Sequence, residues 1–269
     1  MRVLGLAILA LSGCVSPIVN LKAERPFTLE SAKFVIKSDG HSEKDVARLE
    51  KSLERVPLAT ARWGALAQPV TVYIVRNHAE LEAAVGRFGF DWLRAWSTFD
   101  ELIIQAPITW TAVQDVVDEL VIHEVTHNLL FQASADANTW LTREIPLWFR
   151  EGMAISTASQ QGRYPSLEDS AQWLEKGLDP FGDGERLSKN QSTEVYGVGL
   201  HAFEFLVRKH GDEKIRALMA AMHAGDVFGA AFEKAIGISV DDFVKSFREF
   251  MKQREFRQLR KTVPVSATP

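Results

Sequence analysis

The stretch VIHEVTHNLLFQ, residues 121–132, decides the fold, because it contains the pattern H-E-V-T-H. Its two histidines, His123 and His127, are four residues apart, so they lie on one side of an α-helix with about 3.6 residues per turn. Two histidines in this arrangement can hold a zinc ion, and Glu124 beside them can serve as a base. A catalytic zinc site takes three protein ligands and leaves one position open, so a third ligand has to be sought elsewhere in the chain.

The predicted helix around this pattern is apolar on nearly every side. Val116, Leu120 and Leu130 flank the histidines, and other aliphatic residues cover most of the remaining surface. A helix of this kind is buried, and buried histidines need polar partners, which zinc would supply. The alternative is a chance match, because a chain with seven histidines contains H-E-x-x-H by accident in roughly one sequence in a hundred.

The third ligand is not where a metzincin has it. That class extends the pattern to H-E-x-x-H-x-x-G-x-x-H, whereas His127 is followed here by NLLFQAS. A second helix is predicted at PLWFREGMA, residues 146–154, where Pro146 is typical of a helix start. Glu151 follows within two turns, and small residues such as Gly152 permit the close helix approach that a shared metal requires. Glu151 is therefore the predicted third ligand.

These motifs resemble those of the gluzincin zinc peptidases. H-E-x-x-H is followed some two dozen residues later by W-F-x-E-G-x-A, a combination similar to the bacterial peptidase-MA-like group. The likeness runs from about residue 70 to residue 257 and includes the stretches EVYGVGLHAFEFLVRKHGDEKIRALM and AFEKAIGISVDDFVKSFREFM. The resemblance implies a zincin-like fold with a twisted sheet, an active-site helix behind it and a helical C-terminal part.

The resemblance also implies roles for individual residues. His123, His127 and Glu151 would bind one catalytic Zn²⁺, and Glu124 would be the general base that takes a proton from the water that zinc binds. Zinc lowers the pKa of that water and polarises the scissile carbonyl. Tyr196 matches the family's tyrosine-bearing helix and would donate a hydrogen bond to the oxyanion. A packing role for its ring is equally compatible with the sequence.

Two further expectations concern the surroundings of the metal. Ligand histidines usually donate from their other ring nitrogen to a carboxylate or a carbonyl. Glu119 and Glu144 are the candidates, and the alternative for each is a plain surface charge. Residues 102–105 lie just before the active-site helix. In related peptidases such an edge strand pairs with extended substrate, while an ordinary buried strand is the alternative.

The predicted fold class is α+β, with a small N-terminal twisted sheet and helices followed by a mostly α-helical C-terminal part. Strands are expected at 33–37, 69–75 and 101–105, which are rich in apolar and β-branched residues. Helices are expected from the apolar periodicity and from Gly and Pro breaks at 42–63, 78–86, 110–133, 146–159, 166–176, 192–210, 212–223, 226–236 and 239–257.

The first residues, MRVLGLAILALSGC, have the layout of an export signal. A positive charge at Arg2 precedes an apolar run and then small residues, and the run is too short to span a bilayer. A buried first helix is the alternative. The tetrad ending at Cys14 resembles the bacterial lipobox, which implies removal of residues 1–13 and attachment of lipid to Cys14.

The predicted location is therefore the bacterial cell envelope, with a lipid anchor in the membrane. If the source has two membranes, this means the outer membrane or the periplasmic face. The predicted parts are a signal peptide at 1–13, a lipidated tether at 14–30, an N-terminal α+β part at 31–108, a helical zinc-binding part at 109–257 and a disordered tail at 258–269.

The composition is that of an ordinary globular protein, with 46% hydrophobic and 25% charged residues in a chain of 269. A net charge of −4 argues against nucleic-acid binding, which is typical of strongly basic surfaces. The sequence therefore predicts a zinc metallopeptidase that hydrolyses a peptide or protein substrate. The alternative is a non-catalytic zinc-binding envelope lipoprotein that acts as a binding or assembly factor.

The mode of cleavage is indicated by a missing motif. The sequence contains no G-x-M-E-N-like segment of the kind that aminopeptidases use to hold a free N-terminus. This favours an endopeptidase. Neither the natural substrate nor the oligomeric state is indicated by the sequence.

Overall fold

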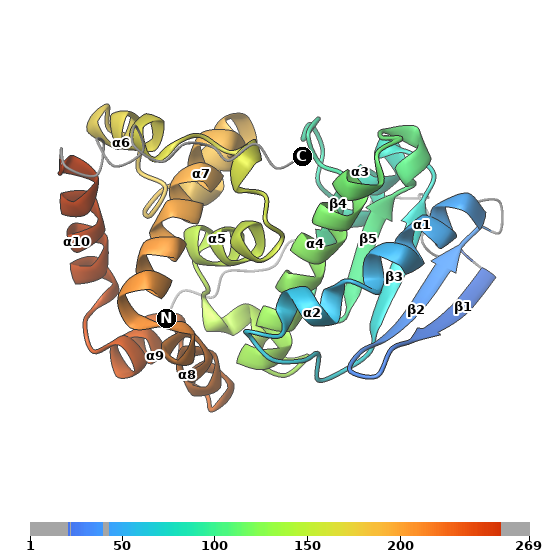
Figure 1. Cartoon of the computed structure of the whole chain (residues 1–269), viewed down its shortest axis with the longest axis horizontal. Helices are drawn as coiled ribbons and strands as arrows, with labels where there is room; N and C mark the ends of the chain where they lie inside the picture. Colours follow the sequence, from blue (N-terminus) through green and yellow to red (C-terminus); the bar gives the residue numbers. More distant parts are fainter. Residues whose placement is uncertain (1–20, 22, 40–42, 254–269) are drawn as a thin grey trace, which may run out of the picture.

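The computed structural model describes residues 21, 23–39 and 43–253. A sheet-containing N-terminal part and a helical C-terminal part lie side by side (Figure 1). The predicted signal peptide, Cys14 and the predicted tail lie outside the described residues. Within the described ranges, no helix combines the length and the apolar character needed to cross a membrane.

The sheet has five strands in the order β1-β2-β3-β5-β4. The central strands β2, β3 and β5 run parallel, and β1 and β4 are added antiparallel at the two edges. The central strands consist mainly of apolar residues, as expected for strands covered on both faces. The bounds are β1 (Ala23–Thr28), β2 (Lys33–Ser38), β3 (Val70–Val75), β4 (Ala95–Ser97) and β5 (Glu101–Gln105).

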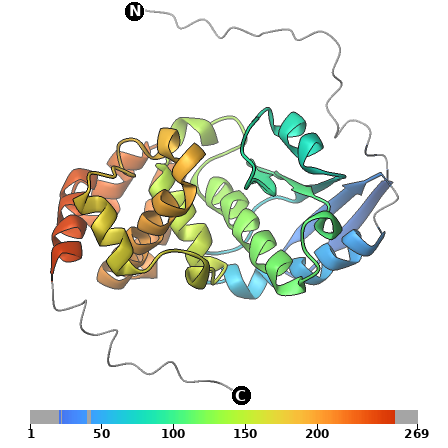
Figure 2. The same ribbon diagram turned by 90° about the horizontal axis from the view of Figure 1, so that it is seen from above.

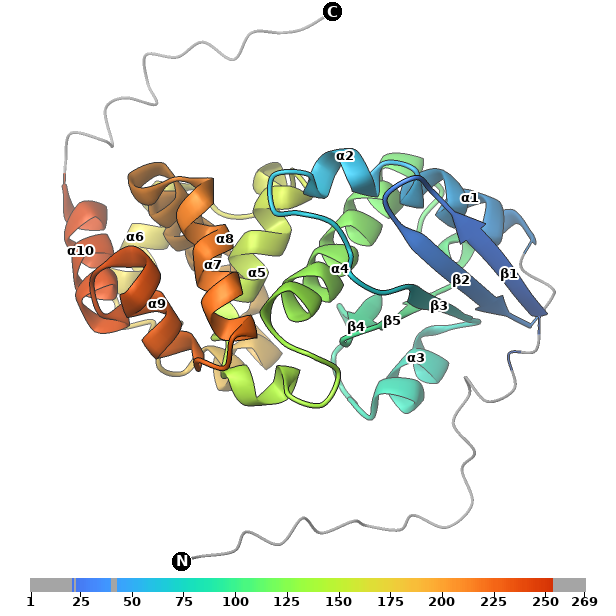
Figure 3. The ribbon, with the colours of Figure 1, turned by 90° about the horizontal axis from the view of Figure 1, so that it is seen from below.

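Helices cover both faces of this sheet (Figure 3). One face packs against α1 (Glu43–Leu53), α2 (Val56–Thr60) and α4 (Gln114–Ser134), and the other against α3 (His78–Val85). Ile104 of β5 belongs to the buried cluster on the α4 side, whereas its neighbour Ile103 packs with Leu81 of α3. Successive residues of a strand point to opposite faces, so the side chains of β5 pack against the helices on both sides of the sheet.

The helical part is built around α5 (Leu147–Thr157) and α7 (Gly184–His210), with the other helices packed around this pair (Figure 2). A Cβ atom on Gly152 would collide with the carbonyl oxygen of Gly199 and lie 2.6 Å from Phe203 Cβ. Gly152 thus permits a close helix approach, but its neighbour is α7 and not the metal-binding helix. The surrounding helices are α6 (Leu167–Glu175), α8 (Asp212–His223), α9 (Phe228–Ile236) and α10 (Val240–Lys252).

The helix α4 belongs to both parts. Val117 and Val121 near its start pack into the buried cluster beneath the sheet, and Leu129 and Leu130 near its end pack into the core of the helical part. His123, His127 and the intervening residues occupy the middle of the helix. The candidate site therefore lies where the two cores meet.

Two strands differ from the expectation. Residues 23–28, expected within the tether at 14–30, form β1 and pair with β2 along their whole length. The predicted extent of the tether is wrong there. The strand could not be recognised in the sequence because AERPFT is almost entirely exposed and shows no buried alternation. The strand β4 is absent from the expected strands. It has three residues, which are too few to show the alternation of apolar and polar residues that indicates a strand.

The order of the strands also corrects the expectation that residues 102–105 form an edge strand. The strand β5, which contains residues 102–105, lies between β3 and β4, so the edge next to α4 is formed by β4. The helix α7 begins at Gly184 and not at 192, with a kink at Gln191. The predicted α+β class, with a small N-terminal sheet followed by a mostly helical remainder, is confirmed.

Candidate metal centre

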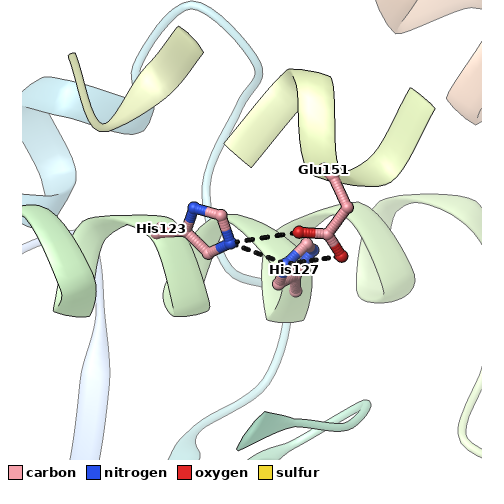
Figure 4. A group of neighbouring side chains, drawn as sticks. All are labelled: His123, His127 and Glu151. Carbon is pink, nitrogen blue, oxygen red and sulfur yellow. Dashed lines mark hydrogen bonds and ion pairs between the residues drawn. The ribbon is translucent and has the colours of Figure 1, made fainter. Parts of the chain in front are cut away.

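His123 and His127 project from α4, and Glu151 projects toward them from α5 (Figure 4). The Nε2 atoms of the two histidines are 3.2 Å apart. Glu151 Oε2 lies 3.4 Å from His123 Nε2, and Glu151 Oε1 lies 3.7 Å from His127 Nε2. One ligand atom from each of these buried residues lies within 4.8 Å of the other two. The structure thus brings together the three residues that the sequence predicts as metal ligands.

The local folding of α4 and α5 explains this convergence. Every residue from 121 to 132 is buried, because α4 is enclosed by the sheet on one side and by helices on the other. Gly152 faces α7. Successive helical residues differ in direction by about 100°, so Glu151 does not share that contact, and its carboxylate meets the histidines of α4.

A side chain from the connection between α5 and α6 orients the first histidine. His123 Nδ1 lies 3.0 Å from Gln160 Oε1, and an amide oxygen can only accept, so Nδ1 carries the proton. Glu119, one of the two expected partners, pairs instead with Arg163. Glu144, the other, is exposed on the wall of a neighbouring cavity. Neither glutamate contacts a ligand histidine, so the alternative of a surface charge holds for both. Gln160 is not among the candidates, because the connection that supplies it has no sequence pattern pointing to α4.

The environment determines the charge of each residue before a metal binds. Burial lowers the pKa of His127 to about 3, so this imidazole is neutral near pH 7. Burial would also lower the pKa of His123, but the hydrogen bond and the charge of Glu151 outweigh it and raise that pKa. Burial would raise the pKa of Glu151, but the histidines and Arg150 lower it to about 2, so the carboxylate is ionised.

These donor groups fit a zinc ion. When His123 is neutral, its proton lies on Nδ1 facing Gln160, and the lone pair of Nε2 is directed at the Glu151 carboxylate and at His127 Nε2. Electron pairs that converge in this way repel one another unless a proton or a metal cation lies between them. The buried His127 Nδ1 has no hydrogen-bond partner in the part of the chain that the structure describes. Two imidazoles and one carboxylate are a ligand set of catalytic zinc.

Glu124 lies next to this ligand set. Ser97 Oγ of β4 donates a hydrogen bond to Glu124 Oε2 at 2.8 Å, and both groups are buried. Burial raises the pKa of Glu124 to about 6, against the charge of His123 and the Ser97 hydrogen bond, which lower it. A carboxylate with a pKa close to neutrality is suited to accept a proton and to return it.

Two further side chains of α4 hold the turn between β4 and β5. Asn128 Nδ2 donates to the carbonyl oxygens of Thr98 at 2.8 Å and Glu101 at 3.0 Å. Gln132 Nε2 donates to a third carbonyl of the same turn at 3.0 Å. With Glu124 these residues follow one another at intervals of four, so successive turns of α4 contact the hairpin. The edge strand β4 is thereby fixed beside the candidate ligands.

A cavity of about 820 Å³ lies beside the ligand residues. Its wall includes Trp92 from the connection between α3 and β4, and Tyr196 from α7. The two rings meet edge to face with 5.9 Å between their centroids. Burial, together with the charge of Glu151, raises the pKa of Tyr196 well above its ordinary value, so the phenol is protonated. Tyr196 therefore packs against Trp92 and also borders the cavity.

A second tyrosine borders the same cavity and is not predicted by the sequence. Tyr164 lies in the connection between α5 and α6, where no periodicity indicates which way a side chain points. Its proximity in sequence to Glu151 is the one signal that could have drawn attention to it. The remaining tyrosine, Tyr73, lies on β3 with its hydroxyl 3.4 Å from Glu101 Oε1, and it is not among the cavity residues.

Fold and site together define a class. A buried helix that carries H-E-x-x-H, a neighbouring helix that supplies a glutamate and a small sheet beside them are the features of a zincin-like metallopeptidase. The comparison with protein families agrees, because the model described as the Peptidase MA superfamily matches residues 52–253. The chain belongs to this superfamily.

Individual relatives are distant. The "Uncharacterized protein YhcO" of Bacillus subtilis (strain 168) is 23% identical over 189 residues, which cover 68% of this chain and 58% of that protein. An aminopeptidase N family protein from Idiomarina loihiensis has a TM-score of 0.46 at 16% identity, covering 84% of this chain and 46% of that chain. An M1 zinc metallopeptidase from Deinococcus radiodurans has a TM-score of 0.43 at 13% identity, covering 92% and 52%. This chain thus spans about half the length of these proteins.

Proposed function

We propose that this protein is a zinc-dependent peptide-bond hydrolase of the gluzincin type. The observation that carries the proposal is the convergence of His123, His127 and Glu151 within 4.8 Å, beside a cavity whose wall also includes Glu124. Membership of a peptidase superfamily supports the same reaction class. The three converging residues are the proposed ligands of one zinc ion.

The ligand residues would hold the metal in suitable protonation states. His127 is neutral and Glu151 is ionised near pH 7, and Gln160 directs the lone pair of His123 Nε2 toward the same point. When bound, zinc would lower the pKa of a water molecule and polarise the substrate carbonyl. Three protein ligands leave a coordination position open for this chemistry.

Glu124 is the proposed general base. During hydrolysis a water oxygen bonds to the carbonyl carbon of the peptide, and the Glu124 carboxylate takes a proton from that water. The proton then passes to the amide nitrogen as the C–N bond breaks, which yields a carboxylic acid and an amine, and near pH 7 the proton of the acid moves to the amine. Ser97 holds the carboxylate by its hydrogen bond to Oε2, so the acceptor oxygen is oriented before substrate binds. Tyr196 is the proposed hydrogen-bond donor to the carbonyl oxygen.

The proposed substrate is an extended peptide or protein segment, cleaved internally. Within the described residues, no strand pairs with the outer edge of β4, and β4 carries Ser97 beside Glu124. An open strand edge offers backbone donors and acceptors to an added strand. Cleavage in the middle of such a segment gives the endopeptidase activity that the sequence favours.

The decisive experiment compares wild type with Glu124→Gln in cleavage of an unfolded protein substrate. We expect the variant to retain zinc, because Glu124 is not a ligand, and to lose activity. Glu233→Gln, on the exposed side of α9, serves as a control with full activity. Equal activity in Glu124→Gln and wild type would refute this mechanism. A wild-type protein that binds one zinc per chain but cleaves no substrate would refute the hydrolase proposal and support the alternative of a non-catalytic zinc-binding protein.

The cell-envelope location is a separate proposal. Its support is the sequence ending at Cys14, which resembles a lipobox. A Cys14→Ser protein should no longer partition with membranes when expressed in bacteria, whereas wild type should. Unchanged membrane partitioning of Cys14→Ser would contradict the lipid anchor and leave the hydrolase proposal unaffected.

A further inference from the structure

The connection between α5 and α6, residues 158–166, runs alongside the metal centre. Near its start Gln160 accepts the hydrogen bond of His123 Nδ1 at 3.0 Å. Four residues later Tyr164 lies on the wall of the cavity that contains Glu124 and Glu151. One short segment therefore both orients a ligand and adds a phenol to the cavity.

Two contacts with α7 fix this segment. Pro165 packs so closely on Gly197 that a Cβ atom there would lie 2.8 Å from Pro165 Cδ. The Pro165 carbonyl oxygen accepts a hydrogen bond from His201 Nε2 at 2.9 Å. Tyr164 precedes Pro165 and Tyr196 precedes Gly197, so this contact brings the two tyrosines to the same part of the cavity.

The hydroxyls of both tyrosines are available to substrate. Neither Tyr164 Oη nor Tyr196 Oη makes a hydrogen bond to another residue that the structure describes. Both residues lie on the cavity wall, and neither hydroxyl oxygen is fully buried. Burial, followed by the charge of Glu151, raises the pKa of Tyr164 as it does that of Tyr196. Both groups therefore remain protonated near pH 7 and can donate.

We propose that Tyr164 is a second catalytic hydroxyl, which donates a hydrogen bond with Tyr196 to the substrate oxygen on which negative charge develops. The proposal rests on the hydrolase function proposed above. Hydrolysis turns a neutral carbonyl oxygen into an anionic one, and donors positioned for that charge stabilise the transition state more than the substrate. The carboxylates of Glu124 and Glu151 border the same cavity, so an added anion there requires donors.

The test compares Tyr164→Phe, Tyr196→Phe and the double variant with wild type. Removing one such donor reduces kcat by roughly 100- to 1,000-fold, and KM should change little. The double variant should lose less than the product of the two single losses, because the donors act on one oxygen. Tyr73→Phe is the matched control, since it removes a hydroxyl that is not in the cavity, and it should retain wild-type kcat.

A second measurement separates catalysis from folding. A phosphonate peptide carries the anionic tetrahedral oxygens of the transition state, so its inhibition constant should rise in Tyr164→Phe by the same factor as kcat falls. Zinc content and melting temperature of the variant should equal those of wild type. Tyr164→Phe with kcat and phosphonate inhibition within twofold of wild type would overturn the proposal, as would a rise in KM at constant kcat.

These outcomes are distinguishable from failure of the hydrolase proposal itself. If wild type cleaves no peptide, or if Glu124→Gln is as active as wild type, the proposed function fails and the role of Tyr164 fails with it. If wild type is active, Glu124→Gln is inactive and Tyr164→Phe is unchanged, only the second hydroxyl is refuted.

Discussion

At the scale of single residues, the proton on His123 Nδ1 determines which nitrogen of this imidazole is free to bind a metal. Gln160 accepts from His123 Nδ1, and this leaves the lone pair of Nε2 directed at the other proposed ligands. A neutral imidazole has one donor and one acceptor nitrogen, so the partner of the donor decides which nitrogen can bind metal. Gln160 is therefore a positioning residue that acts through His123.

Replacing Gln160 tests this role. In Gln160→Ala, His123 loses its fixed tautomer and orientation, and we expect zinc affinity to fall by roughly 10- to 100-fold. Gln161→Ala is the matched control, because its neighbouring side chain contacts Glu204 at 3.3 Å and not the centre. Competition with a chromophoric chelator measures both affinities. Identical zinc affinity in Gln160→Ala and Gln161→Ala would contradict the role of Gln160.

The pKa of His123 predicts how zinc affinity depends on pH. In the metal-free site that pKa is raised above 6.5, and zinc needs the unprotonated Nε2. Affinity should therefore fall by about tenfold per pH unit as pH drops below the raised pKa, because one proton competes with the metal. The same protonation favours the metal-free fold below pH 6.5, a contribution that is lost as pH rises through the folded pKa.

Chelator competition between pH 8 and pH 6 checks this dependence, with a pH-corrected chelator constant. Zinc affinity that is constant over this range would contradict the assigned protonation of His123. His127 should not contribute in this window, because burial lowers its pKa to about 3.

Residue spacing predicted only part of this centre. H-E-x-x-H placed two imidazoles on one side of a helix. The predicted second helix at 146–154, with its small residues, singled out Glu151, which the structure brings next to both histidines. Gln160 and Tyr164 were missed because they lie in an irregular connection, where neither spacing nor periodicity defines a direction. Their positions depend on long-range contacts such as that of Pro165 with Gly197.

At the scale of elements, the relation between α4 and the β4–β5 hairpin positions the edge strand beside Glu124. Asn128 supplies two hydrogen bonds to the turn, and its side chain is completely buried. Without Asn128 the partly buried carbonyl of Thr98 would lose this donor, whereas the Glu101 carbonyl also accepts from Thr98 N at 2.9 Å. An unsatisfied carbonyl lowers stability. The hairpin and the helix are thus held in one relative position.

Substitution of Asn128 should weaken both stability and activity. In Asn128→Ala, we expect the free energy of unfolding to fall by about 1–3 kcal/mol, and kcat/KM to fall because β4 and Ser97 shift relative to Glu124. Asn190→Ala, at an exposed position of α7, is the control. Denaturant unfolding and peptide cleavage measure the two effects. Wild-type kcat/KM in a destabilised Asn128→Ala would show that the contact serves folding alone.

Most helices and the central strands could be predicted because their own sequences show apolar periodicity. The structure has α4 and α5 within a few residues of the expected bounds. The short β4 and the exposed β1 depend on pairing with partners that are distant in sequence or weakly patterned. The order of the strands, and with it the identity of the edge, follows from that pairing and not from any one segment.

At the scale of the whole molecule, α4 links two hydrophobic cores. Its first half packs beneath the sheet and its second half within the helical part, so loss of either core exposes part of the same helix. The predicted boundary between 31–108 and 109–257 lies just before α4, and the contacts of α4 with α1, α2, β4 and β5 cross it. We therefore expect the two parts to unfold together.

Equilibrium unfolding tests this cooperativity. Far-ultraviolet circular dichroism reports mainly on the helical part, and hydrogen exchange on β3 and β5 reports on the sheet. In a two-state transition these probes give the same midpoint. Separate midpoints in denaturant would contradict the shared helix as a structural link, and would make the two parts independent folding units.

The central claim is that His123, His127 and Glu151 hold a zinc ion, and zinc content tests it most directly. We expect one zinc per chain in purified wild type and in the control Glu233→Ala at neutral pH, and strongly reduced zinc in Glu151→Ala. The carboxylate that contributes to the ligand set is removed only in the latter. Wild type without bound zinc, or Glu151→Ala with unchanged zinc content and affinity, would contradict the account.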